Sequence, residues 1–222
     1  MTEVKEQNES GQVLDNTNTN EPSNNRVSEN HSSSHLKNVE APEMQIESED
    51  EGENETILRL TSQKLSEIPA DIAQTKGETV RTLVLTNNKI RSLANLQYFK
   101  RLETLQLDRN GMLDIDDMPK MPYLRTLWLN NNQLSDMHNL LKILAKNCPR
   151  LSYLSLLRNP VCPSIYFTHG NEDKYRRYRF TVLYHLHGLT YLDTTEVTQK
   201  EQKEALEKGK FLVVKKTFTT TS

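Results

Sequence analysis

The sequence of 222 residues lacks most features that mark secreted, membrane-spanning or metal-binding proteins. It contains two cysteines, Cys148 and Cys162, which are too few for a disulfide scaffold and lack the spacing of a zinc site. No apolar run approaches the roughly 18–20 residues of a membrane-spanning helix. The first residues also lack the apolar stretch of a secretory signal. We therefore expect a cytoplasmic protein, with the nucleus as the alternative compartment.

Aromatic residues are missing from the first quarter of the chain. Residues 1–53 hold 13 acidic and 3 basic residues and no Phe, Tyr or Trp, whereas residues 54–222 hold 17 acidic and 25 basic residues. A segment this polar cannot bury enough apolar surface to offset the entropy lost on ordering, so we expect a disordered acidic arm. Ser48, which precedes Glu49-Asp-Glu51, is a candidate phosphosite there. The opposite charges would let the arm fold back on the basic body.

A pattern of about 22 residues repeats through the middle of the chain. The spacing Leu-x-x-Leu-x-Leu-x-x-Asn-x-Leu occurs four times. A degenerate first copy around Leu58–Leu65 has Gln63 near the asparagine position. This is the leucine-rich repeat signature. The four asparagines are expected to satisfy backbone groups between stacked coils. They are Asn88, Asn110, Asn132 and Asn159.

The repeat predicts an α/β fold, because each copy sends alternate side chains of a short strand to opposite faces and buries its apolar face only by stacking. We expect a right-handed leucine-rich repeat solenoid, with short parallel strands on the concave face, short helices or turns on the convex face, and a helical carboxy-terminal cap. The expected boundaries are 1–53 for the arm, 54–162 for about five coils, 163–196 for the cap, and 197–222 for a short helix and tail.

The expected cap is a helix with one apolar stripe, followed by a final half-repeat. Arg176, Arg177 and Arg179 are expected to face solvent, and the buried tyrosines argue against direct contact with nucleic acid. Thr198 and Glu201 form a capping box for a further helix that is expected to end at Gly209. Residues 211–214 are expected to pack on the cap, unless the tail is a docking peptide. The cap residues are Tyr175, Tyr178, Val182, Leu186, Leu189 and Leu192.

No set of residues suggests catalysis, a cofactor or a metal, so we expect a non-enzymatic protein. His185 and His187 have no further metal ligands nearby in the sequence. Asp114, Asp116 and Asp117 lack the glycine and glutamate of a calcium loop, and the expected role is to start a helix on the convex side.

The outward positions of the strands predict a surface that binds a protein partner. Trp128 is the only tryptophan of the chain and falls mid-sheet on this surface, where an aromatic anchor ringed by polar groups is typical of a binding hot spot. The alternative is that the arm or the tail covers it. The candidate contacts are Arg59, Val84, Gln106, Asp108, Arg109, Trp128, Asn130, Tyr153, Leu157 and Arg158.

Two resemblances refine this interpretation. The tyrosine-rich cap with its Leu-x-x-Leu-Asp ending resembles that of intracellular leucine-rich repeat proteins, including the spliceosomal U2 A-prime family. Residues 151–163 and the Tyr-Arg-Arg-Tyr-Arg cap at 175–179 resemble the leucine-rich melanocyte differentiation-associated protein family more closely. That resemblance implies an adaptor in endosomal trafficking and pigment-cell differentiation, monomeric alone, that bridges a Rab-type small GTPase and an endosomal retrieval complex. The alternative is a U2 A-prime-like scaffold that binds an RNA-binding protein.

Overall fold

The computed structural model describes residues 56–163 and 171–212, all of which belong to one compact unit of residues 39–222. The predictions for the acidic arm, Ser48 and the last ten residues fall outside the described residues. Within them, no helix has both the length and the apolar character needed to cross a membrane.

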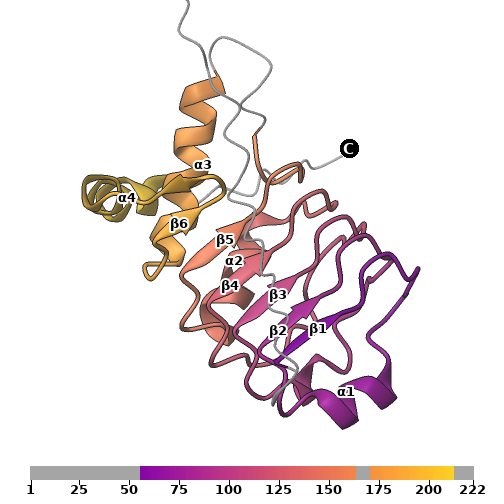
Figure 1. Cartoon of the computed structure of the whole chain (residues 1–222). Coiled ribbons are helices and arrows are strands. Elements are labelled where there is room, and N and C mark those ends of the chain that lie inside the picture. The colour runs from indigo at the N-terminus through magenta and orange to yellow at the C-terminus, as the bar shows by residue number, and fades with distance from the viewer. Residues whose placement is uncertain (1–55, 164–170, 213–222) are drawn as a thin grey trace, which may run out of the picture. The chain divides into compact units, whose positions relative to one another are not determined.

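The repeats build one sheet of short strands in chain order (Figure 1). Strands β1 to β6 are parallel, and β7 (Thr195–Glu196) pairs antiparallel with β6. The central residues of β1 to β5 are in register and are all leucines, which places equivalent side chains of successive coils side by side. The predicted solenoid fold is confirmed. The parallel strands are β1 (Ile57–Arg59), β2 (Thr82–Val84), β3 (Thr104–Gln106), β4 (Thr126–Trp128), β5 (Tyr153–Ser155) and β6 (Tyr191–Leu192).

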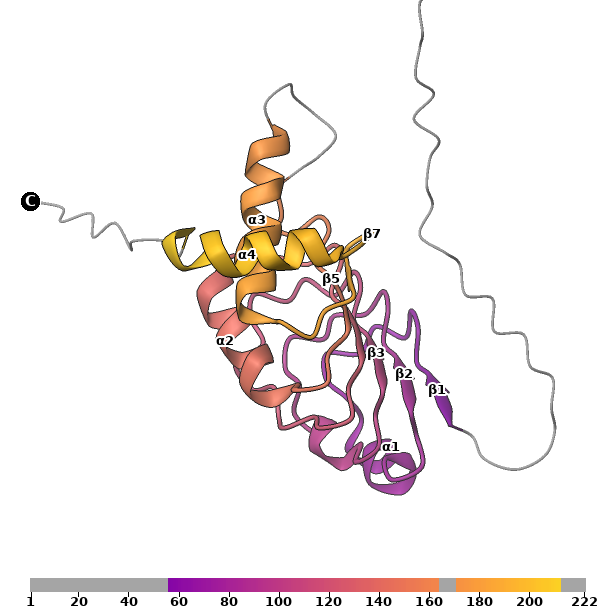
Figure 2. The ribbon, with the colours of Figure 1, turned by 90° about the vertical axis from the view of Figure 1, so that its left-hand side faces the viewer.

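The convex side carries short helices that vary from coil to coil. They are α1 (Ala70–Lys76), the 3-10 helix η1 (Leu96–Tyr98) and α2 (Met137–Asn147). Figure 2 shows the sheet edge-on with α2 across the core from it. The Asp136 side chain accepts a hydrogen bond from the Asn139 N–H and so caps the start of α2.

The expectation that the acidic residues after Leu113 start a convex helix was wrong. No helix lies between β3 and β4. Instead, Asp117 accepts hydrogen bonds from the Ser92 hydroxyl (2.6 Å) and the Leu93 N–H (2.7 Å) of the preceding coil. Asp116 accepts one from the Asn139 side chain of the next coil (2.6 Å). These carboxylates therefore join neighbouring coils.

The core lies between the sheet and the convex segments and consists almost entirely of aliphatic side chains. Leu83, Leu105 and Leu154 are fully buried in register. Both cysteines are buried, and burial raises the pKa of each thiol to about 12, so both stay protonated at neutral pH. Protonated, buried thiols fit a packing role better than a chemical one.

The four repeat asparagines are buried and connect each coil to the one before it. The Asn132 side-chain oxygen accepts hydrogen bonds from the N–H groups of Asn110 (3.0 Å) and Met112 (3.1 Å). Its amide donates to the carbonyls of Leu107 (3.0 Å) and Leu129 (2.9 Å). One side chain thus satisfies four backbone groups that water cannot reach. Asn88, Asn110 and Asn159 make the same kind of contact. We call these four residues the asparagine ladder.

The first coil departs from this pattern. Gln63 does not extend the ladder, because its side chain is exposed. Its backbone N–H instead donates to the Asn88 side-chain oxygen (2.9 Å).

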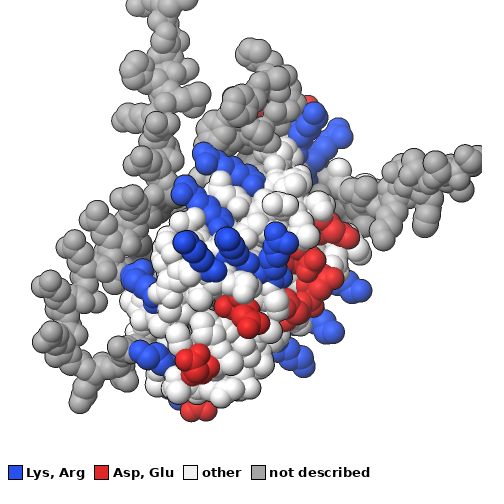
Figure 3. Space-filling model, turned by 90° about the vertical axis from the view of Figure 1, so that its right-hand side faces the viewer, with Lys and Arg blue, Asp and Glu red and all other residues white. Residues whose placement is uncertain are grey.

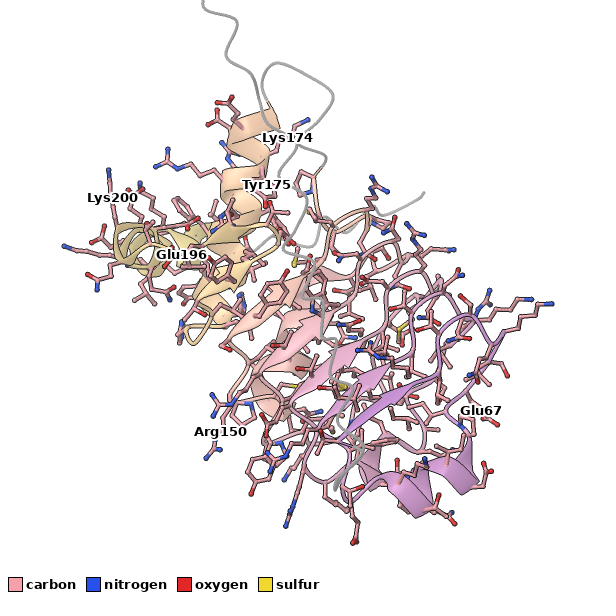
Figure 4. All side chains as sticks on the ribbon, viewed as in Figure 1. Glu67, Arg150, Lys174, Tyr175, Glu196 and Lys200 are labelled. Carbon is pink, nitrogen blue, oxygen red and sulfur yellow. The ribbon has the colours of Figure 1, made fainter. Side chains whose placement is uncertain are left out.

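The cap consists of α3 (Asn171–His185), β6, β7 and α4 (Gln199–Leu212). Figure 4 shows Tyr175 on α3 close to where this helix meets the repeats, and Lys200 on the far side of the cap. The Tyr175 ring is partly buried and stacks on Tyr178 with centroids 5.4 Å apart. The other expected cap residues are buried: Tyr178, Val182, Leu186, Leu189 and Leu192.

Arg179 was wrongly expected on the solvent-facing side of the cap. It is only 7 % exposed and pairs with Glu201 of α4 through two hydrogen bonds of 2.5 and 2.8 Å. It also donates to the Leu192 carbonyl (2.9 Å). A buried guanidinium with a bidentate carboxylate partner fixes the geometry between the two helices. Arg176 and Arg177 are exposed as expected.

Gly209 does not end α4, contrary to expectation, because the helix continues to Leu212. Gly209 is buried against Tyr184 of α3, and a Cβ at this position would lie 2.4 Å from the Tyr184 Cβ. The glycine therefore permits close contact between α3 and α4. Phe211 is 79 % exposed and does not pack on the cap, whereas Leu212 is partly buried.

Replacing Asn132 by alanine tests the ladder. Asn132→Ala removes the partner of four buried backbone groups, so we expect a loss of about 2–4 kcal/mol in the free energy of unfolding, measured by urea denaturation. The neighbouring Gln133→Ala removes an exposed side chain and should change stability by no more than about 0.5 kcal/mol. Equal effects of the two substitutions would contradict the structural role of the ladder.

Candidate functional site on the concave face

Three aromatic side chains stand in a row on the concave face, over β4 to β6. The rings of Trp128 and Tyr153 stack with centroids 4.8 Å apart and an angle of 29°, and the rings of Tyr153 and Tyr191 lie 6.2 Å apart at 21°. Tyr191 is 42 % exposed, and Trp128 and Tyr153 are partly exposed. We call Trp128, Tyr153 and Tyr191 the aromatic row. Its members offer apolar surface at the end of the sheet nearest the cap.

The register of the strands explains how the row forms. Tyr153 pairs with Tyr191, whereas Trp128 pairs with Ser155. Ser155 is small and buried, which leaves room for the indole to lie toward Tyr153. Tyr191 was not among the predicted contacts, although its place in register with Tyr153 is a signal that the sequence contains.

The aromatic row is held in place before any partner binds. The Tyr153 hydroxyl donates a hydrogen bond to the Asp193 carbonyl (3.1 Å). Burial, together with the charges of Asp193 and Asp108, raises the pKa of Tyr153 to about 12, so the hydroxyl remains a donor at neutral pH. Asp193 is itself fixed, because its carboxylate accepts from the Leu156 N–H (2.8 Å) and from the Tyr175 hydroxyl (2.9 Å).

Asp108 and Asn130, two predicted contacts, belong to a second row of hydrogen bonds between coils. Asp108 accepts from the Asn130 N–H (2.7 Å). The Asn130 side-chain oxygen accepts from the Ser155 hydroxyl (2.6 Å) and the Leu157 N–H (2.9 Å). Burial raises the pKa of Asp108, and the hydrogen bonds from Asn130 and the positive charge of Arg109 oppose the rise. Asn130 is only 8 % exposed, so its predicted role as an accessible contact is wrong.

Val84 also differs from prediction, since it is 5 % exposed although it points to the concave side. Its neighbours in register are Arg59 and Gln106, whose longer side chains flank it. The remaining predicted contacts are accessible to different degrees. Gln106 and Leu157 are partly exposed, whereas Arg59, Arg109 and Arg158 are exposed.

Arg109 and Arg158 occupy a backbone conformation that arginine disfavours. Their φ angles are 56° and 58°, and the equivalent positions of the other three coils hold Ser62 (60°), Asn87 (59°) and Asn131 (55°). Asparagine tolerates this left-handed region, whereas the same conformation costs arginine roughly 1 kcal/mol. The conformation recurs in all five coils, so the repeat geometry imposes it whatever residue stands there. Arg158 follows β5, the strand that carries Tyr153, and Arg109 follows β3.

The described residues offer little for other chemistry. They contain no group of three or more His, Cys, Asp or Glu side chains that could hold a metal ion. A hollow of about 130 Å³ lies between α3 and α4, but its carboxylates are paired: Glu204 with Arg176 (2.7 Å) and Glu201 with Arg179. The arrangement on the concave face is suited to recognition of another surface.

Comparison with known proteins shows to which family the chain belongs. The family described as leucine-rich repeat matches residues 52–217, which is most of the chain. The chain belongs to the leucine-rich repeat family. This family membership and the concave surface support a protein-interaction role for the repeat domain.

Individual relatives within the leucine-rich repeat family differ in their sequence identity to this chain and in the share of each protein that the match covers. The human leucine-rich melanocyte differentiation-associated protein is 46 % identical over 132 residues, which are 59 % of this chain and 66 % of that protein. The U2 small nuclear ribonucleoprotein A' of Aspergillus fumigatus is 32 % identical over 127 residues, 55 % of this chain and 44 % of that protein. The matches therefore span less than two thirds of these relatives.

A solved structure of the Drosophila melanogaster SNF/U2A' complex includes a chain that is 23 % identical, with a TM-score of 0.44. The match covers 67 % of this leucine-rich repeat chain and 98 % of that chain.

The buried hydroxyl of Tyr153 predicts a loss of stability in alkali. An unfolded phenol loses its proton near pH 10.0, whereas the folded Tyr153 keeps it until about pH 12. The unfolded state therefore binds fewer protons in this interval, and the free energy of unfolding should fall as the pH rises from about 10 to 12. Urea denaturation across this interval should show a shallower fall for Tyr153→Phe. The exposed Tyr123→Phe is the control, and equal slopes in both variants would contradict the assignment.

Proposed function

We propose that the chain is a non-enzymatic adaptor that binds a partner protein on its concave face, with the aromatic row as the anchor. The observation that carries this proposal is the stacked row itself, which is partly exposed, with the exposed Arg109 and Arg158 on the loops after β3 and β5. Aromatic residues and arginine are enriched at the residues that dominate binding energy. Apolar side chains ringed by polar ones are the usual composition of such a surface.

The rigidity of the surface supports the proposal. The sheet is fixed by two rows of hydrogen bonds between coils, and Tyr153 is fixed by its bond to the Asp193 carbonyl. Binding to such a surface orders few groups, so little of the contact energy is lost to entropy.

The finer proposal is an adaptor in endosomal or lysosome-related organelle trafficking, in the cytoplasm and monomeric when alone. It rests on the 46 % identity to the human leucine-rich melanocyte differentiation-associated protein. By that resemblance the partners are a Rab-type small GTPase and an endosomal retrieval complex. The alternative is a scaffold for an RNA-binding protein, which the identities to U2 small nuclear ribonucleoprotein A' proteins support.

Affinity purification of the full chain followed by mass spectrometry separates these proposals. Recovery of a small GTPase with retrieval-complex subunits supports the trafficking adaptor, and recovery of spliceosomal proteins supports the alternative. Recovery of neither group with the wild-type chain contradicts both finer proposals.

Replacing the indole tests the anchor. Trp128→Ala should weaken partner binding by about 2 kcal/mol or more, because a central aromatic anchor is lost. Titration calorimetry with the purified partner measures the change, and circular dichroism verifies the fold. Phe211→Ala is the matched control, since Phe211 is an exposed aromatic residue of α4 outside the concave face. A folded Trp128→Ala variant with wild-type affinity would remove Trp128 from the site.

Arg109→Asn tests the same surface without a risk of unfolding. Asparagine suits the left-handed backbone, so we expect a gain of about 0.5–1 kcal/mol in stability together with weaker partner binding. The same two assays measure both effects. Retained affinity in the stabilised variant would show that the arginine is not part of the binding surface.

A further inference from the structure

A row of basic side chains lies in the loops at the carboxyl ends of the strands. Figure 3 looks onto this side of the molecule and shows Lys and Arg gathered there in a band. Five of these side chains are exposed and come from loops that directly follow β1, β2, β3 and β5. We call them the basic edge: Lys64, Lys89, Arg91, Arg109 and Arg158.

The backbone fixes these residues in four coils, and the coil of β4, which separates Arg109 from Arg158, contributes none of them. The Lys89 N–H donates to the Leu65 carbonyl (2.8 Å), and the Arg109 N–H donates to the Asn130 carbonyl (2.9 Å). Neighbouring strands of a sheet lie about 4.8 Å apart. Equivalent positions of neighbouring coils, such as those of Lys64 and Lys89, are therefore closer than the screening length of about 8 Å at physiological salt, and like charges there repel.

The basic edge lacks the counter-charges that other basic residues have. Arg81 pairs with Glu103, Arg176 with Glu204, and Arg179 with Glu201. Among residues 56–163 and 171–212, no carboxylate forms an ion pair with any residue of the basic edge.

Two polar neighbours do not neutralise this edge. Asp108 precedes Arg109 in the chain, but its carboxylate accepts from the Asn130 N–H (2.7 Å) and forms no ion pair with Arg109. Arg158 reaches only the Asn131 amide oxygen, at 3.5 Å. Within the described residues the basic edge therefore presents exposed cationic side chains that no ion pair engages, which suits an anionic partner.

The chain itself carries a segment of matching charge, which joins the sheet at the start of β1, at the other end of the strands from the basic edge. Residues 40–55 contain eight carboxylates and no lysine or arginine, and they join directly to the start of β1. We propose that this acidic segment docks in cis on the basic edge.

The length of the chain permits this contact. Ten extended residues span about 33 Å, whereas the distance along β1 and its following loop to Lys64 is about 25 Å at the same rise per residue. A short tether also keeps the local concentration of the segment in the millimolar range, so weak pairing is sufficient.

Docking of the segment has a consequence for the concave face. Arg109 and Arg158 belong both to the basic edge and to the predicted contacts of the concave face. A partner that uses these arginines must displace the acidic segment, which therefore restrains binding. Salt or a more acidic partner releases this restraint.

Zero-length crosslinking of the full chain tests the contact directly. A carbodiimide joins carboxylates to lysine amines only where they touch, and mass spectrometry identifies the joined peptides. We expect Glu40, Glu43 and Glu47, which are at least nine residues from the start of β1, to crosslink to Lys89 but not to Lys142 and Lys146, which are also exposed and lie on α2. At about 1 M salt the screening length falls to about 3 Å, and the Lys89 crosslinks should be lost. Lys64 is too close to the segment in sequence to be informative.

Charge variants complete the test. Arg109→Gln with Arg158→Gln should reduce the Lys89 crosslinks about tenfold, because two counter-charges are removed. Arg101→Gln with Arg125→Gln is the matched control, since these exposed arginines precede β3 and β4 at the opposite edge, and the yield should not change. Equal crosslinking to the α2 lysines, or insensitivity to salt, would overturn the proposal. An equal mixture of isotopically distinct copies should give crosslinks within one copy, and crosslinks between copies would also overturn it.

Discussion

The structure depends on the need of each coil to satisfy its buried backbone groups through the next coil. A coil of about 22 residues has no second layer of its own, so its apolar face and its turn both become buried only on stacking. The ladder asparagines meet this requirement, since one amide such as that of Asn132 serves four backbone groups in two coils. The carboxylates of Asp108 and Asp117 add further bonds between coils on the concave and convex sides.

The same requirement recurs at the end of the solenoid, where the cap takes the place of a further coil. The Asp193 carboxylate replaces a backbone carbonyl of a further coil, because it accepts from the Leu156 N–H, whereas the equivalent N–H groups of Leu107 and Leu129 donate to carbonyls of the next coil. The second carboxylate oxygen of Asp193 holds Tyr175 of α3, and the Asp193 carbonyl holds Tyr153 of the aromatic row. The end of the repeats and the candidate binding surface therefore share one buried aspartate, which explains why the aromatic row lies beside the cap. Changes that loosen the cap are expected to disturb this surface.

The sequence predicted the repeats well because they follow from spacing alone. The asparagine positions, the helix at α2 and the apolar stripe of the cap are all local patterns. The errors concern contacts between distant segments. Gly209 matches a helix end in sequence, but its role is set by the Tyr184 ring of another helix. Arg179 matches a solvent-facing position, but Glu201 of α4 buries it.

The candidate surface was predicted in outline and not in detail. Alternation placed Trp128 and Tyr153 on the concave side, and it also placed Val84 and Asn130 there, yet both are buried. Alternation gives the direction of a side chain, whereas exposure depends on the length and bonding of its neighbours in register. The backbone strain at Arg109 is likewise invisible in a repeat pattern that tolerates many residues before the asparagine.

Because Trp128 is the only tryptophan, its fluorescence reports on the concave face without any label. The most direct measurement is quenching of this fluorescence by a small neutral quencher, in the free protein and with saturating partner. The account predicts that the indole is accessible in the free protein and protected in the complex, because it stands partly exposed at the centre of the binding surface. An indole that is inaccessible in the folded free protein, or equally accessible with saturating partner, would contradict the account.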